Sequence, residues 1–109
     1  SACLDELFAA DPDLTGLVVH NEAVLPGLLS DLRHRGLRVP QDVSVIAVCP
    51  DTMAEQHPVA LTTVAIPAEE VGTQAVEMTM RRLGGHTTPE VRLLGPRLTR
   101  RDSTAAPRT

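Results

Sequence analysis

Five side chains that can bind or react with a small molecule follow directly on two apolar runs of the chain. They are His20, Asn21, Glu22, Cys49 and Asp51. The first three follow the run Leu17–Val19, and the last two follow Val43–Val48 with Pro50 between them. Carboxylates accept strong hydrogen bonds from ligand hydroxyls, whereas a thiol is a weak acceptor and becomes a nucleophile only when it ionises.

The two apolar runs indicate neighbouring buried strands, and ligands bind outside the carboxyl ends of parallel strands in open α/β sheets. We therefore expect the polar side chains to share one edge of a sheet. Asn21 has a second interpretation, because Asn is also a preferred residue for capping the helix that follows. Both roles stay open for Asn21.

Cys49 has no positive neighbour in sequence to lower its thiol pKa, so we favour a passive buried or pocket cysteine over a reactive one. Cys3 and Cys49 share no CxxC or histidine-paired spacing, which indicates two reduced thiols rather than a disulfide framework. The histidines also lack a metal-ligand spacing. We expect no metal and no cofactor. The histidines are His20, His34, His57 and His86.

The elements that must position these residues follow from apolar periodicity and from helix start and stop signals. We expect helices over 2–10, from Asn21 to Gly36 and from Pro67 to Leu83, and strands at Leu17–Val19, Val43–Val48, Leu61–Ile66, 89–95 and 96–101. Pro26 predicts that the second helix starts late or kinks. A polar loop follows Cys49. Gly72 indicates close packing of the third helix against another backbone.

This αβαβ order predicts an α/β fold with a parallel sheet, right-handed crossovers and flanking helices. We expect one structural unit over 1–102 and a disordered tail over 103–109. Because strands this apolar need cover on both faces, the chain reads as a fragment of a larger domain. The absence of an initial Met also indicates a processed or excised chain.

The composition excludes two classes of function for this chain. Of its 109 residues 42% are hydrophobic, and the net charge is −4. The arginines gather only near the end, in PRLTRRDSTAAPRT, so no basic face for nucleic acid runs through the chain. No apolar run approaches the roughly 18 residues of a membrane helix. Phe8 is the single aromatic residue, so the core must be aliphatic.

Three stretches of the sequence carry a family resemblance. They are HNEAVLPGLLSDLRHRGLRVPQDVSVIAV, PVALTTVAIPAEEVGTQAVEMTMRRLGG and LTRRDST. In order and spacing they resemble the C-terminal part of LacI/GalR-type transcription regulators, and the resemblance covers nearly the whole chain. It implies a periplasmic-binding-protein-like (type I) fold of two α/β subdomains, of which this chain is the C-terminal portion.

The resemblance also implies a function without catalysis. A small-molecule effector would bind between the subdomains, in contact with His20, Asn21, Glu22, Cys49 and Asp51, and would change the affinity for operator DNA. The DNA would be bound by a domain absent from this chain, in a cytoplasmic homodimer. The strand Leu61–Val64 would cross to the first subdomain, the helix Pro67–Leu83 would belong to it, and a strand near Leu98 would return.

The sequence departs from the family where sugar hydroxyls are normally held. Cys49 and Pro50 occupy the positions of a paired Asp, and Asp51 could substitute only if the loop were re-aimed. Glu22 replaces an Asp, and Ile66 replaces a polar residue. We therefore expect a less polar cleft, for a sugar, a less polar metabolite or no ligand.

A second surface follows from the resemblance. The helix Val24–Leu32 and the loop Asp51–His57 resemble the subunit interface of the family, through Val24, Leu25, Leu28, Leu32 and Met53. The alternative is that the leucines belong to the core of the chain, and both roles can hold. Arg101 and Asp102 in the closing motif read as a structural ion pair.

Two other classes of function remain as alternatives. A periplasmic or secreted solute-binding protein of the same fold is the first, and a signal peptide upstream would favour it. An enzyme with Cys49 as nucleophile is the second, and it requires a base near the thiol.

Overall fold

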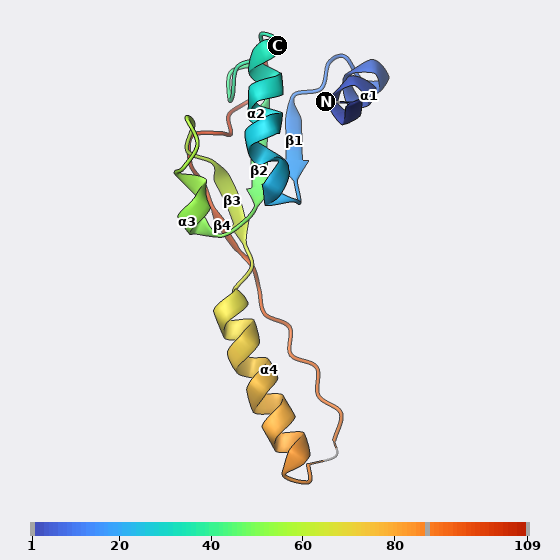
Figure 1. Ribbon diagram of the computed structural model, residues 1–109, viewed down its shortest axis with the longest axis vertical. Coiled ribbons are helices and arrows are strands. Elements are labelled where there is room, and N and C mark those ends of the chain that lie inside the picture. The colour runs from blue at the N-terminus through green and yellow to red at the C-terminus, as the bar shows by residue number, and fades with distance from the viewer. Residues whose placement is uncertain (1, 87, 109) are drawn as a thin grey trace.

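The computed structural model of the protein describes residues 2–86 and 88–108 (Figure 1). The elements along the chain are α1 (Ala2–Ala10), β1 (Gly16–Val19), the 3-10 helix η1 (Glu22–Val24), α2 (Leu25–His34), β2 (Ser44–Val48), α3 (Asp51–Ala54), β3 (Thr62–Ala65), α4 (Ala68–Leu83) and β4 (Arg97–Thr99). The strands form one sheet in the order β1-β2-β3-β4. The first three strands are parallel, and β4 runs antiparallel to β3. The predicted α/β fold is confirmed.

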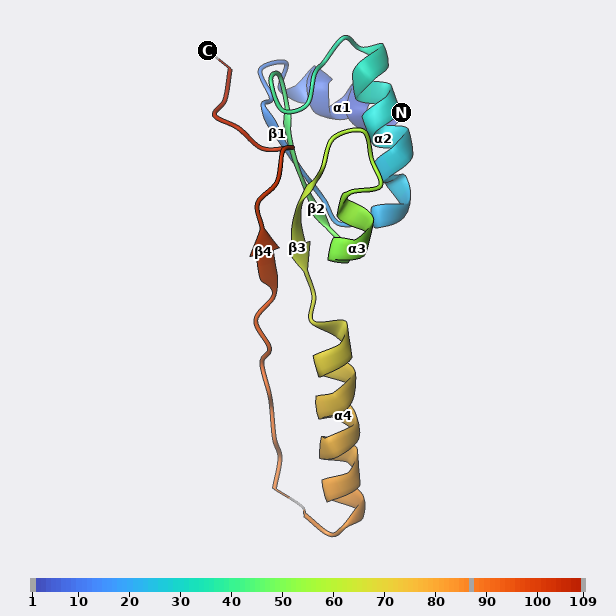
Figure 2. The same cartoon turned by 90° about the vertical axis from the view of Figure 1, so that its left-hand side faces the viewer.

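The core lies on one face of this sheet. Figures 1 and 2 show α1, α2 and α3 together on that side. For α2 and α3, which connect successive parallel strands, right-handed crossovers place both helices on the same face. Residues alternate between the two faces along β2, where Val45 and Ala47 are fully buried and their neighbours are partly exposed. Leu25 and Leu32 of α2 meet them without any exposed surface.

Burial of the first strand is less complete than the sequence predicted. Val19 is buried, but Val18 on the opposite face is 74% exposed. β1 is an edge strand of the sheet, and no helix among the described residues covers its second face.

The second helix starts late, as Pro26 predicted. Asn21 caps η1, and α2 begins only at Leu25 with Pro26 in its first turn, where the missing N–H costs nothing. The helix ends at His34, and Gly36 with φ +75° allows Leu37 N to donate back to Leu32 O at 3.0 Å. The expected loop after Cys49 is instead partly helical, because α3 buries Ala54.

α4 projects away from the sheet and gives the molecule its length of 60 Å (Figure 1). Pro67 is the N-cap rather than the first helical residue. No described residue of α4 is buried, and a side chain at Gly72 would meet nothing within 4 Å. The expected close packing at Gly72 is therefore not made within this chain. Apolar side chains of α4 are left exposed, namely Val71, Val76, Met80 and Leu83.

Of the two strands expected near the end, one forms. Residues 89–95 run beside α4 as an extended segment without strand pairing (Figures 1 and 2). Arg92 links this segment to α4 through an ion pair with Glu77 at 3.5 Å and a bond to Gln74. Only Arg97–Thr99 forms a strand, because there the chain reaches β3.

The tail expected to be disordered from Ser103 is attached to the sheet. Ser103 is fully buried, and its Oγ donates to Val45 O at 2.5 Å and accepts from Thr62 N at 2.8 Å. Further on, Ala105 N donates to Ser44 Oγ, and Arg108 donates to backbone carbonyls of Leu14 and Asp42. The folded unit thus extends past the expected boundary at residue 102. None of the helices described is long and apolar enough to cross a lipid bilayer.

Candidate functional site

The carboxyl ends of β1 and β2 bring three of the predicted residues to one pocket. Val19 pairs with Ala47 in the parallel register, so the segments after the two strands lie beside each other. The pocket has a volume of about 260 Å³ and is lined by His20, Glu22, Val48, Cys49, Pro50, Ile66 and Ala68. Ile66 and Ala68 come from the connection between β3 and α4 and the start of that helix. A molecule in this pocket therefore contacts both the sheet and the base of α4.

Asn21 does not line this pocket, and the structure places it as a helix cap. Its Oδ1 accepts a hydrogen bond from Ala23 N at 3.0 Å, with extended backbone angles of φ −103° and ψ 109°. The capping role is confirmed. Asn21 is exposed at the strand end, and contact with a ligand stays a prediction.

Cys49 is buried, with 4% of its surface exposed. Burial raises the pKa of its thiol above the ordinary value, and the negative charges of Glu22 and Asp51 add to this, while Arg101 acts in the opposite direction. A thiol with a raised pKa carries little thiolate at neutral pH. The electrostatics therefore weigh against the nucleophile reading.

We expect Cys49 to be alkylated by iodoacetamide at least about tenfold more slowly than Cys3 at neutral pH, because reaction needs an accessible thiolate. Cys3 is exposed and provides the internal reference. Peptide mass spectrometry after timed quenching gives both rates from one sample. In urea the two rates should converge, and equal rates in the folded protein would contradict the buried placement of Cys49.

Asp51 lies at the same edge of the sheet but is bound to the protein. Its Oδ1 accepts from Thr63 Oγ1 at 2.9 Å and from Arg101 Nη2 at 3.1 Å, and its Oδ2 accepts from Arg97. The bond from Arg97, followed by those from Thr63 and Arg101, lowers the pKa of Asp51 to about 2. Asp51 is therefore hydrogen-bonded to residues of both β3 and β4, and its side chain does not line the pocket.

The lowered pKa of Asp51 predicts a pH dependence of stability. Since the folded-state pKa lies below the unfolded-state value of 3.8, the unfolded chain binds more protons between these values. The contribution of Asp51 is thus present above about pH 4 and is lost as the pH falls toward 2. We expect Asp51→Asn to reduce the slope of unfolding free energy against pH in this window, measured by urea denaturation. Asp102→Asn, at an exposed carboxylate outside this network, is the matched control.

The sequence did not predict that Thr63 and Arg97 bind Asp51, and the predicted ion-pair partner of Arg101 was wrong. Arg101 pairs with Asp51 rather than with its neighbour Asp102. Its Nη1 also donates to Leu61 O at 3.0 Å and to Thr63 Oγ1 at 2.7 Å. The closing motif marked Arg101 as structural, but nothing in the local sequence could identify a partner fifty residues away.

The residues expected at a subunit interface divide into two groups. Leu25 and Leu32 have no exposed surface, so their interface assignment is corrected to the core. Val24 is 49% exposed, and Leu28 and Met53 are partly buried. A dimer contact through Val24, Leu28 and Met53 stays a prediction.

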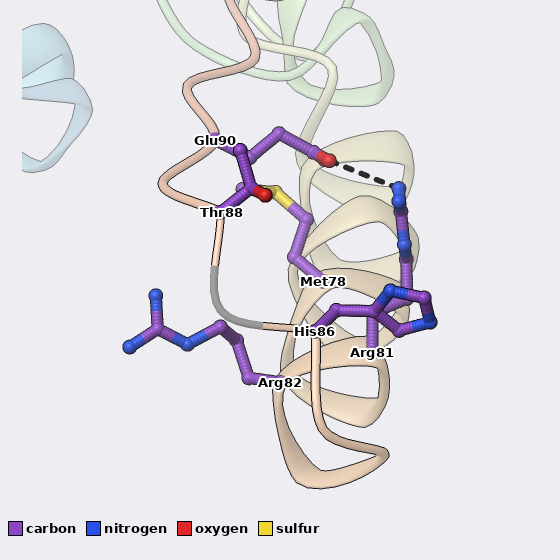
Figure 3. Close-up of a pocket in the computed structure, with 6 residues that line it drawn as sticks. All are labelled: Met78, Arg81, Arg82, His86, Thr88 and Glu90. Carbon is purple, nitrogen blue, oxygen red and sulfur yellow. Dashed lines mark hydrogen bonds and ion pairs between the residues drawn. The ribbon is translucent and has the colours of Figure 1, made fainter.

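Other hollows also occur on the described surface, and two of them lie beside β1 and at the far end of α4. The larger, about 610 Å³, is mainly apolar and lies along the free edge of β1 between α1 and α2, with Leu7, Val18 and Val24 in its lining. The other, about 270 Å³, lies at the far end of α4 (Figure 3). There Arg81 is already paired with Glu90 at 2.9 Å, and Arg82 points away from that pair.

None of the predicted site residues lines the hollow at the far end of α4. Within residues 2–86 and 88–108, no three His, Cys, Asp or Glu side chains gather in a way that could hold a metal ion.

Comparisons with known proteins show the family to which this chain belongs. The sequence matches the periplasmic binding protein-like domain over residues 2–104. The repressor PurR of Vibrio cholerae is 35% identical over 79 residues, which are 72% of this chain and 24% of PurR. A LacI family regulator from Bifidobacterium animalis matches in fold with a TM-score of 0.87 and 22% identity, covering 98% of this chain and 40% of that chain.

A solved complex of the transcriptional regulator CelR with cellobiose also matches. Its TM-score is 0.80 at 32% identity, covering 94% of this chain and 32% of that chain. The chain thus belongs to the periplasmic-binding-protein-like family. The resemblance to the effector domain of LacI/GalR-type regulators is confirmed. The chain spans about a quarter of the length of the PurR relative.

Proposed function

We propose that this chain is the C-terminal part of the effector-binding and dimerisation domain of a ligand-responsive transcriptional regulator. The observation that carries the proposal is the pocket at the ends of β1 and β2, whose lining also includes Ile66 and Ala68 at the base of α4. The matched relatives are named as repressors and regulators of transcription. In this proposal the chain performs no catalysis and acts in the cytoplasm.

The geometry supports a physical route from ligand to DNA. Two segments join the sheet to α4, namely the connection after β3 and the segment before β4 (Figures 1 and 2). A ligand that contacts both the sheet and the base of α4 binds with a different free energy when these two parts change their relative orientation. The ligand therefore shifts the population toward the orientation that it binds more tightly. Operator affinity then follows through linkage, in a domain outside this chain.

The exposed apolar surfaces support a larger parent protein. The apolar residues of α4 fit a second subdomain, and the hollow beside β1 fits a further strand of the same sheet. Val24, Leu28 and Met53 supply the homodimer contact in this proposal. A solute-binding protein of the same fold is the alternative, because a fold by itself does not determine function.

DNA binding by the full-length protein tests the proposal. The probe is the DNA upstream of its own coding region, at a stated salt concentration, with a scrambled fragment as control. Specific binding that a pool of small metabolites strengthens or weakens is the expected result. If the protein bound a metabolite from the pool but showed no specific DNA binding, the solute-binding alternative would be favoured.

A further inference from the structure

The pocket at the ends of β1 and β2 contains one carboxylate that the protein leaves available. Glu22 lines the pocket and is partly buried, and no donor in the described part of the chain bonds or ion-pairs with its carboxylate. Asp51, by contrast, is held by Thr63, Arg97 and Arg101. The two acidic side chains at this edge therefore differ in role, and Glu22 is the one that can receive a ligand.

The remaining lining of the pocket is largely apolar. Val48, Pro50, Ile66 and Ala68 present no side-chain polar atom, and the Cys49 thiol is a weak hydrogen-bonding group. The walls that this chain contributes offer no partners for several hydroxyls of a sugar, and each hydroxyl left unpaired on burial costs free energy. Only His20 and Glu22 among the lining residues offer strong polar groups.

The part of the pocket that this chain forms disfavours an anion through its charge. Its lining contains no Lys or Arg, and the nearby guanidinium groups of Arg97 and Arg101 are bound to Asp51. The pKa of the Cys49 thiol is raised, first by burial and then by the charge of Glu22. This direction also indicates that the surroundings of the thiol oppose another negative charge. A positive group beside Glu22 would instead gain a charge-assisted hydrogen bond.

We propose that this pocket binds a small organic amine, with its ammonium group on the Glu22 carboxylate and its apolar body against Val48, Pro50 and Ile66. The inference rests on the proposed function, because it names the chemical class of the effector. The volume of about 260 Å³ lies just below the usual range for ligand pockets, which suits a compact molecule.

Binding of matched probes to the full-length protein, measured by titration calorimetry, tests this inference. Cyclohexylammonium, cyclohexanecarboxylate and glucose compare a cation, an anion and a polyol of similar size. We expect cyclohexylammonium to bind at least about tenfold more tightly than the other two. Glu22→Gln should weaken its binding by about ten- to hundred-fold, the value of one hydrogen bond to a charged group. Glu6→Gln removes an exposed carboxylate on α1 and should leave binding unchanged.

Three outcomes would overturn the inference: tighter binding of glucose or the carboxylate, no binding of the ammonium at millimolar concentration, or equal binding by Glu22→Gln and the unmodified protein. Circular dichroism of Glu22→Gln verifies that the variant is folded. Operator binding without ligand separates this inference from the proposed function. Specific DNA binding without ammonium binding overturns the amine alone. Glu22-dependent ammonium binding without specific DNA binding overturns the regulator and keeps the amine.

Discussion

Replacing Arg101 by methionine is expected to destabilise the protein by about 1.5–3 kcal/mol, the value of hydrogen bonds that involve a charged group. The Arg101 side chain is only 15% exposed and pairs with Asp51 at 3.1 Å. Its Nη1 donates to Leu61 O and to Thr63 Oγ1. Methionine retains most of the aliphatic stem and removes all of these donors, so the loss reports the polar contacts rather than a cavity.

Urea denaturation followed by circular dichroism measures this loss, since the chain has no Trp or Tyr for fluorescence. Arg100→Met is the matched control, because Arg100 is exposed and adjacent. Its effect should stay within about 0.5 kcal/mol, as for most surface substitutions. If both variants lost the same stability, the link between the Asp51 loop, β3 and Arg101 would be absent in solution.

The secondary structure was predictable because its signals are local. Apolar runs located three of the strands, Asn21 and Pro26 located the late start of α2, and Gly36 located its end. The errors have a common origin in contacts between distant parts of the chain. Ser103 looked like the start of a polar tail, yet Val45 and Thr62 bury it. Residues 89–95 looked like a strand, but that stretch lies beside α4 and reaches no partner strand.

The candidate site shows the same division between local and distant information. The position of His20, Glu22 and Cys49 after two apolar runs was enough to bring them to one edge of a parallel sheet. The sequence could not distinguish the roles of Glu22 and Asp51, because both are acidic residues at strand ends. The difference depends on Arg97 and Arg101, which β4 and the segment after it bring to Asp51 but not to Glu22.

Replacing Leu32 by alanine is expected to cost about 2–5 kcal/mol, the usual range for truncation of a buried leucine. Leu32 has no exposed surface, and it is part of the core cluster that contains Leu25, Val43 and Val45. Truncation removes buried apolar surface and leaves a cavity between α2 and the sheet. Leu93→Ala is the matched control, since Leu93 is 92% exposed, and it should change the unfolding free energy by less than about 0.5 kcal/mol.

The same variant separates the core from the proposed dimer contact. Because Leu32 is buried within one chain, the cost of Leu32→Ala should not depend on protein concentration. Leu28 is partly exposed, so a dimer contact there predicts that the cost of Leu28→Ala grows as the protein is concentrated. Urea denaturation at two concentrations a hundredfold apart compares the two variants. A cost at Leu32 that changed with concentration would mean that α2 packs against a partner rather than against its own sheet.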